Sequence, residues 1–199
     1  MPRVQTVQDM PFVAGNPALD FVNTAEERGH PDAGEALHGP AELVVWGQRY
    51  GLLSRSARVG PGAAREFKRA LEARELLYEL FSASLHQRRP RQASLTRLAE
   101  LAAEAYRAAE LKPSSGGVEW SWSRSELASV RHVAVTSAVQ LLEAGGLARL
   151  KQCPGDHCGW FFLDATKRGN RRWCQMSECG QDAKGRRRRE RQEVGSKSH

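Results

Sequence analysis

The chain has 199 residues, 40% hydrophobic and 27% charged, a composition typical of a soluble globular protein. No apolar run approaches the roughly 20 residues of a membrane span, and the first residues lack the apolar core of a secretory signal, so we expect a cytoplasmic protein without a membrane partner. The net charge of +7 is uneven: residues 151–199 hold 12 Lys and Arg against 6 Asp and Glu, whereas residues 1–150 hold 18 against 17. This asymmetry favours a neutral body joined to a segment that binds a polyanion.

The first elements are short. Residues 12–24 read as a turn followed by an extended or helical apolar segment, because Gly15, Asn16 and Pro17 are turn residues. The polar stretch 31–40 predicts a loop, and residues 41–53 predict a helix that ends near Gly51.

The clearest helix is predicted over residues 62–89, where apolar side chains recur every three or four positions. Its turn at 76–81 is apolar on several sides, which motivates the expectation of burial there and of a homodimer. Further along, the pattern predicts a helix over 93–111, a link at 112–117, a strand at 118–123 and a helix over 125–144 capped by Ser123 or Ser125. We expect Trp46, Trp120 and Trp122 to lie in the core.

Arg74 lies on the apolar stripe of the 62–89 helix, where a guanidinium needs an acceptor. Two interpretations remain open: an internal salt bridge, with Asp20 as a candidate partner, or a small anionic ligand. Asp20, Asn23 and Thr24 are polar groups inside an apolar stretch and serve either as local caps and turns or as ligand contacts. The candidate ligand-binding residues are therefore Arg74, Asp20 and Asn23.

All four cysteines lie within one segment, with the spacing Cys153-x4-Cys158-x15-Cys174-x4-Cys179. Two close pairs separated by about 15 residues are typical of four-thiolate zinc sites, because each short loop brings two sulfurs to one side of the ion. Disulfides, unligated thiols or another metal are the alternatives, and a ligand swap to His157 or Asp156 stays open. We expect residues 160–164 and 171–174 to pair as a hairpin around a turn at 166–170.

A basic segment follows the last cysteine. On a helix capped by Ser177, four basic side chains would share one face at i, i+3, i+4 and i+7: Lys184, Arg187, Arg188 and Arg191. The basic residues of the hairpin would extend this charged surface. Dense like charges suit phosphates, although a solvated disordered tail is the alternative. Trp160 and Trp173 either pack a small core or stack on bases. The candidate nucleic-acid contacts are Lys167, Arg168, Arg171, Arg172, Lys184, Arg187, Arg188 and Arg191.

The run "CPGDHCGWFFLDATKRGNRRWCQMSECG" resembles the CGNR zinc finger of bacterial regulators, and "AGNPALDFVNT" and "LEARELLYELFSA" resemble the ABATE domain that precedes it. The resemblance implies a stress-induced DNA-binding transcription regulator whose N-terminal domain senses a ligand or stress signal. Cys153, Cys158, Cys174 and Cys179 match the family's zinc ligands. The name-giving Cys-Gly-Asn-Arg reads Cys-Gly-Gln181-Asp182 here. Either this position does not touch DNA, or the chain binds DNA weakly or in another register.

These observations predict an α+β protein: a mostly helical domain with a small sheet, then a small four-cysteine finger of hairpin and helix, treble-clef-like. The expected divisions are 1–146, 147–192 and a disordered tail over 193–199. The predicted function is a Zn²⁺-dependent regulator that binds double-stranded DNA. An interaction or ligand-binding protein with a purely structural finger, and an RNA-binding protein, are the alternatives. No nucleophile–base set or glycine-rich phosphate loop stands out, so no enzyme is predicted.

Overall fold

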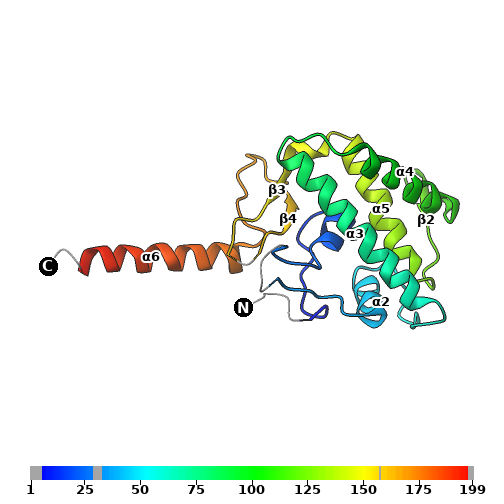
Figure 1. Ribbon diagram of the computed structural model, residues 1–199, viewed down its shortest axis with the longest axis horizontal. Helices are drawn as coiled ribbons and strands as arrows, with labels where there is room; N and C mark the ends of the chain where they lie inside the picture. The colour runs from blue at the N-terminus through cyan, green and yellow to red at the C-terminus, as the bar shows by residue number, and fades with distance from the viewer. Residues whose placement is uncertain (1–5, 29–32, 157, 197–199) are drawn as a thin grey trace.

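The computed structural model describes residues 6–28, 33–156 and 158–196, with the backbone alone over 190–196. Three long helices, α3 (Ala63–Leu85), α4 (Gln92–Arg107) and α5 (Ala128–Glu143), lie side by side and form the main layer (Figure 1). We call residues 6–145 the body and residues 150–180 the finger. Helix α6 (Gln181–Ser196) projects away from both as a straight helix (Figure 1).

Helix α3 confirms the clearest prediction, since its apolar spacing places Leu77, Leu80 and Phe81 in the core. Leu77, Leu80 and Phe81 of the apolar turn at 76–81 are thus packed inside the chain, with Leu76 and Tyr78 half-buried, so the turn gives the expected homodimer little support. Dimerisation stays a prediction without that support.

Two short helices close the other side of the body. Helix α1 (Pro17–Val22) begins at Asn16, whose side chain accepts a hydrogen bond from the Ala18 amide at 2.9 Å. It packs against α3 and α5, and helix α2 (Pro40–Arg49) packs against α3. Trp46 is fully buried, as expected, beside Phe21 at a ring distance of 5.4 Å.

The region after α4 differs from its prediction. The helix ends at Arg107, and residues expected as helix end and link form β1 (Glu110–Ser114), which pairs with β2 (Gly117–Ser121). The strand itself was predicted correctly, but the core position of its tryptophan was not: Trp120 is 41% exposed, and its ring lies 5.1 Å from the Tyr106 ring of α4. Trp122 is half-buried, and its indole N–H donates to the Ala105 carbonyl at 2.8 Å.

Helix α5 is buried along most of its length, including the guanidinium of Arg131. It starts after Leu127 with no side-chain cap, so the expected cap by Ser123 or Ser125 is wrong; those two hydroxyls bond each other at 3.0 Å. Arg131 donates to Glu66 of α3 at 2.6 Å and to Glu104 of α4 at 3.0 Å, and so ties three helices together. Hydrogen bonds from Arg69 and Arg131 lower the pKa of Glu104 to about 2 against its partial burial.

A one-turn helix, η1 (Gly146–Arg149), leads into the finger. There β3 (Leu150–Gln152) pairs antiparallel with β4 (Phe161–Leu163), so the expected pairing of 160–164 with 171–174 is wrong. The loop of the first cysteine pair is itself the hairpin connection, which returns the chain to β3 before residue 171 is reached. The segment 171–174 forms no strand, and a turn of π-helix, η2 (Met176–Gly180), runs directly into α6. The α+β class is confirmed by these helices and two small sheets.

The finger packs onto the body through one hydrophobic cluster. Phe161 of β4 lies 5.5 Å from the Tyr78 ring and 6.3 Å from the Phe81 ring of α3. Helix α6 extends to Ser196 and so includes residues 193–196 of the segment expected to be a disordered tail; residues 197–199 lie outside the described range.

Candidate metal centre and nucleic-acid interface

The four cysteine sulfurs form one buried cluster, all within 4.8 Å of one another. Cys158 Sγ lies 3.6 Å from Cys174 Sγ, which lies 3.4 Å from Cys179 Sγ. A sulfur tetrahedron around zinc with bonds of about 2.3 Å has edges of about 3.8 Å, close to these distances. A disulfide needs about 2.0 Å, and all four cysteines are free. The residues fit a four-thiolate metal site.

Local structure places each sulfur. The chain turns between β3 and β4, where the Cys153 amide donates to the Trp160 carbonyl at 2.8 Å and the Cys158 amide to the Gly155 carbonyl at 3.2 Å. A Cβ at Gly155 would lie only 2.7 Å from Cys179 Sγ, so this position requires glycine. Of the alternative ligands, Asp156 pairs instead with Arg186 of α6, and His157 lies outside the described residues.

The thiols perturb one another strongly. The neighbouring Cys153 raises the pKa of both the Cys158 and the Cys174 thiol, and burial raises both further. Ionising all four sulfurs in one buried site is unfavourable without a cation. A divalent metal removes that cost, because the thiolate is the form that binds it.

Asp164 organises the loop that follows β4. Its buried carboxylate accepts hydrogen bonds from Lys151 Nζ at 2.6 Å, Thr166 Oγ1 at 2.5 Å and the Arg171 amide at 2.8 Å. Burial opposes ionisation, but these donors outweigh it and hold the pKa of Asp164 below its ordinary value. The loop over 166–171 is therefore held in place by one carboxylate.

Arg171 was predicted to contact nucleic acid, and the structure gives it internal partners. Its guanidinium donates to the carbonyls of Val13 at 2.9 Å, Leu163 at 3.2 Å and Cys174 at 2.5 Å, and lies over the Phe162 ring. A planar fork of donors suits such a junction. Arg171 thus joins body, strand and metal loop, a role that no local pattern signals.

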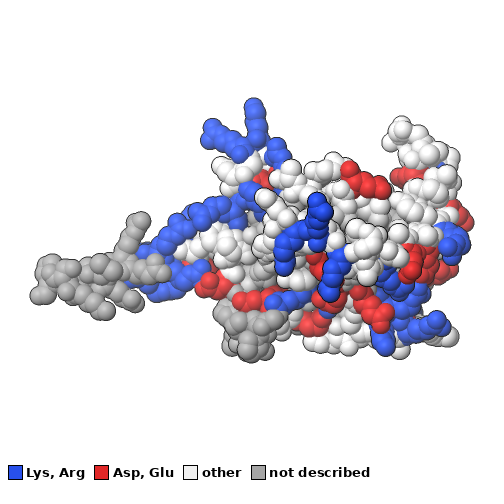
Figure 2. All heavy atoms as spheres, turned by 45° about the horizontal axis from the view of Figure 1, so that its top comes forward, with Lys and Arg blue, Asp and Glu red and all other residues white. Residues whose placement is uncertain are grey.

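Most other predicted contacts are exposed, in two groups. Lys167, Arg168 and Arg172 lie on the loop after β4, and Lys184, Arg187 and Arg188 lie on α6. The side chain of Arg191 lies outside the described residues. Figure 2 shows blue side chains along the base of the projecting helix, whereas red and blue mix over the far end of the body.

No local sequence pattern indicated the ion pair between Arg186 and Asp156, which joins α6 to the first cysteine loop. Trp160 is buried in the finger, and Trp173 is half-buried with Arg172 5.7 Å from its ring. Ser177, the expected cap, is exposed in η2, whose preceding residue Gln175 makes no side-chain cap bond.

Two of the candidate ligand-binding residues are engaged in structural contacts. The Asn23 side chain bonds both backbone groups of Phe161, at 2.8 Å each. Asp20 accepts from the amides of Val13 and Ala14 at 3.0 Å each, and from the Tyr50 hydroxyl at 3.2 Å. Burial raises the pKa of Asp20 to about 6 against these hydrogen bonds. These residues fit the local-contact interpretation.

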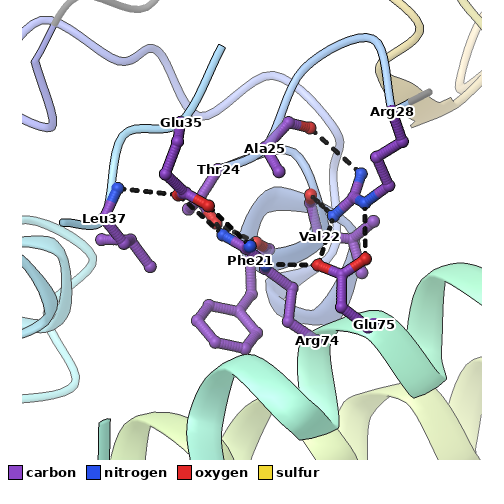
Figure 3. Close-up of polar contacts among 9 residues, drawn as sticks. All are labelled: Phe21, Val22, Thr24, Ala25, Arg28, Glu35, Leu37, Arg74 and Glu75. Atoms are coloured by element: carbon purple, nitrogen blue, oxygen red, sulfur yellow. Dashed lines mark hydrogen bonds and ion pairs between the residues drawn. The ribbon is translucent and has the colours of Figure 1, made fainter. Parts of the chain in front are cut away.

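Arg74 has an internal partner, but not Asp20, because the α1 geometry turns Asp20 toward Val13 and Ala14. Its guanidinium holds Glu35 through two hydrogen bonds at 2.8 and 2.7 Å, and bonds Thr24 and Glu75 at 2.9 Å each (Figure 3). Burial disfavours its charge, yet the carboxylates of Glu35 and Glu75 outweigh burial and raise its pKa. Binding of an anion at Arg74 stays a prediction, and it would have to displace Glu35.

Arg28 extends the same network. It shares Glu75 with Arg74 at 2.9 Å and donates to the carbonyls of Val22 at 2.8 Å and Ala25 at 3.1 Å (Figure 3). The preceding residue, Glu27, donates its amide to the Cys158 carbonyl at 3.2 Å. The charged network therefore adjoins the metal loop through one short stretch of chain.

The fold and the site define a class of protein in which a helical domain is followed by a small four-cysteine domain and a basic terminal helix. Residues 15–145 match the family described as "ABATE: Putative stress-induced transcription regulator", and residues 149–192 match the CGNR zinc finger. The chain belongs to the ABATE family and carries a CGNR zinc finger, as the resemblance predicted. A search of curated proteins found no matching relative.

Both matched families are regulator and zinc-finger types and not enzyme families. In the described part of the chain, no helix has the length and apolar character needed to cross a membrane.

Proposed function

We propose that this protein is a zinc-dependent transcription regulator that binds double-stranded DNA through the finger and α6, in the cytoplasm of a bacterium. The observation that carries the proposal is the cluster of four buried sulfurs at the base of a projecting helix with exposed Lys184, Arg187 and Arg188. Zinc would occupy the four thiolates, stabilise a finger too small to hold its own core, and fix the start of α6. The cations then contact phosphates, which gives affinity without sequence preference.

In this proposal the body supplies regulation, and stress is the signal that its family description names. Contacts at Asn23, Glu27 and Arg171 join body and finger, so a change in the body has a physical path to the DNA-binding part. Asp182 lies in the first turn of α6, where an acidic group suits the helix dipole but would repel a phosphate, so the proposal places the phosphate contacts further along the helix.

The test is fluorescence anisotropy with a short random-sequence DNA duplex and a single-stranded RNA of equal length, at low and moderate salt. The proposal expects DNA binding whose logarithmic affinity falls linearly with the logarithm of salt concentration. Preference for RNA would favour the RNA-binding alternative.

A second candidate function is supported by the close packing of the finger on the body. If the finger serves only to complete the fold, the protein is an interaction or ligand-binding protein. Absence of binding to either nucleic acid at low salt, with zinc bound and the chain folded, would support that candidate over the first.

A further inference from the structure

The finger contains a surface hollow of about 410 Å³ beside the metal loop. It lies between the loop after β4, which contributes Thr166 and Asn170, and the start of η2, which contributes Met176. Arg171, Arg172, Trp173 and Cys174 form the rest of its walls. None of the residues that line it is acidic.

The walls suit a flat, mostly apolar group. Trp173 presents an aromatic ring, and Met176 is 56% exposed, an unusual degree for a large apolar side chain. The Asn170 side chain places an amide at one rim, where it offers hydrogen bonds to polar edges, whereas the Thr166 hydroxyl beside it already donates to Asp164. An aromatic face with amide groups beside it is the kind of surface on which nucleobases stack.

The surroundings favour a group attached to phosphate. Arg172 lines the hollow, and Lys167 and Arg168 are exposed on the same loop. The exposed cations of α6 begin at Lys184, on the helix that follows η2 directly. A nucleobase that carries its own phosphate satisfies both the apolar walls and the cationic rim.

Close packing at Gly180 fixes the positions of two side chains that line the hollow. A Cβ at Gly180 would lie 2.2 Å from Met176 Sδ and 3.3 Å from Trp173 Cδ1, so glycine lets these two side chains lie against the chain at η2. Arg171 also lines the hollow, and internal carbonyls hold its guanidinium in place. Met176 and Trp173, which form two walls of the hollow, therefore pack closely against the backbone at Gly180.

We propose that this hollow receives one nucleobase turned out of the DNA, stacked on Trp173 and Met176. The inference rests on the proposed DNA binding and adds to it a site for a base. Turning a base out of a duplex costs energy, and the cost is least where the base is unpaired. The finger should therefore prefer DNA with an unpaired base over a perfect duplex.

The test compares three DNA probes by anisotropy: a fully paired duplex, the same duplex with one extra thymidine, and the same duplex with an abasic nucleotide in place of that thymidine. We expect about tenfold tighter binding to the extra thymidine than to the other two, the size of one stacking contact. Met176→Ala and Trp173→Ala should remove most of this preference and leave affinity for the paired duplex within about twofold. Val59→Ala, at an exposed apolar side chain of the body, is the matched control and should change nothing.

Zinc content and circular dichroism are measured for each variant, and Met176→Ala carries the test if Trp173→Ala fails to fold. Equal binding to the thymidine and abasic probes by the unmodified protein overturns the base pocket and leaves the proposed function intact. A preference that survives Met176→Ala and a folded Trp173→Ala also overturns it. No binding to any of the three probes overturns the proposed function itself.

Discussion

Asn23 and Phe161 are joined as if they were neighbours in a sheet, although they are 138 residues apart in sequence. The Asn23 amide donates to the Phe161 carbonyl and the Asn23 carbonyl accepts from the Phe161 amide, each at 2.8 Å. One side chain thus satisfies both polar groups of a buried strand residue, and it belongs to α1's C-cap. This contact is the most specific link between the body and the finger.

Asn23→Ala should destabilise the protein by about 1–3 kcal/mol, because it leaves buried backbone groups of Phe161 without partners. The free energy of unfolding in urea measures the effect, and hydrogen exchange should show weaker protection of the Phe161 amide. Asn170→Ala, at an exposed asparagine of the loop after β4, serves as control and should have little effect. Equal stability of Asn23→Ala and the unmodified protein would show that the contact contributes nothing net.

The protein should contain one zinc ion per chain, measured by elemental analysis after purification without added metal. Cys158→Ser should reduce zinc affinity by more than the about 10–100-fold that removal of an outer-shell partner costs, because it removes a ligand itself. Ser177→Ala, exposed in η2, should keep its zinc. Absence of stoichiometric metal in the unmodified protein would contradict the assignment.

Gly155→Ala should also weaken zinc binding, for a steric reason. The added methyl group would lie 2.7 Å from Cys179 Sγ and 3.1 Å from Cys179 Cβ, so one side of the metal site must move. Competition with a chelating dye measures the change in zinc affinity. Gly169→Ala is the control: its added methyl group meets open space at a φ of 62°, so it introduces backbone strain without contact with a sulfur.

Asp20 should make stability depend on pH. Its folded pKa of about 6 lies above the unfolded value of 3.8, so the folded state binds the proton more tightly. The contribution is fully present below about pH 4 and is lost as pH rises through about 6. Asp20→Asn keeps the two backbone acceptor contacts and removes the titration. Between the unfolded pKa and the folded pKa, the unmodified protein loses about 1.4 kcal/mol of stability for each pH unit. The variant should therefore gain roughly 2.4 kcal/mol relative to the unmodified protein between pH 4 and pH 7. Urea unfolding at several pH values measures this, and a constant difference across that range would contradict the raised pKa.

The buried Arg131 should contribute far more to the free energy of unfolding than its partly exposed neighbour Arg69, although both contact Glu66 and Glu104. Arg131→Met removes a fully buried cation and leaves Glu66 and Glu104 with Arg69 as their remaining partner, so it should cost about 3–5 kcal/mol. Arg69→Met removes a pair that solvent already screens and should cost about 1 kcal/mol or less. Chemical unfolding of both variants measures this, and equal destabilisation would refute the distinction.

Substitution of Arg187 and Arg188 by alanine should weaken DNA binding at low salt. It should also reduce the slope of the salt dependence by about 1 for each phosphate that the variant no longer binds. Substitution of Arg55 and Arg65 by alanine, at two exposed arginines of the body, provides the matched charge change and should leave the slope unchanged. An unchanged slope for the α6 variant would place the phosphate contacts elsewhere.

Features that depend on neighbours along the chain could be predicted from the sequence. The three- and four-residue spacing of apolar side chains predicted α3, because helical periodicity is a local property. The spacing of the four cysteines predicted a metal site, because short loops bring sulfurs together whatever the rest of the fold does. The helical class and the exposed cations of α6 followed from equally local patterns.

The partners of distant groups, in contrast, depend on how the elements pack. Packing pairs β4 with β3 and places Glu35, not Asp20, beside Arg74. It also surrounds Arg171, a predicted phosphate contact, with backbone carbonyls that its guanidinium binds. It also buried Arg131 between two glutamates that no sequence spacing connects. A charge or a strand edge bonds whichever group lies within reach in space, and that proximity has no signature in the order of residues.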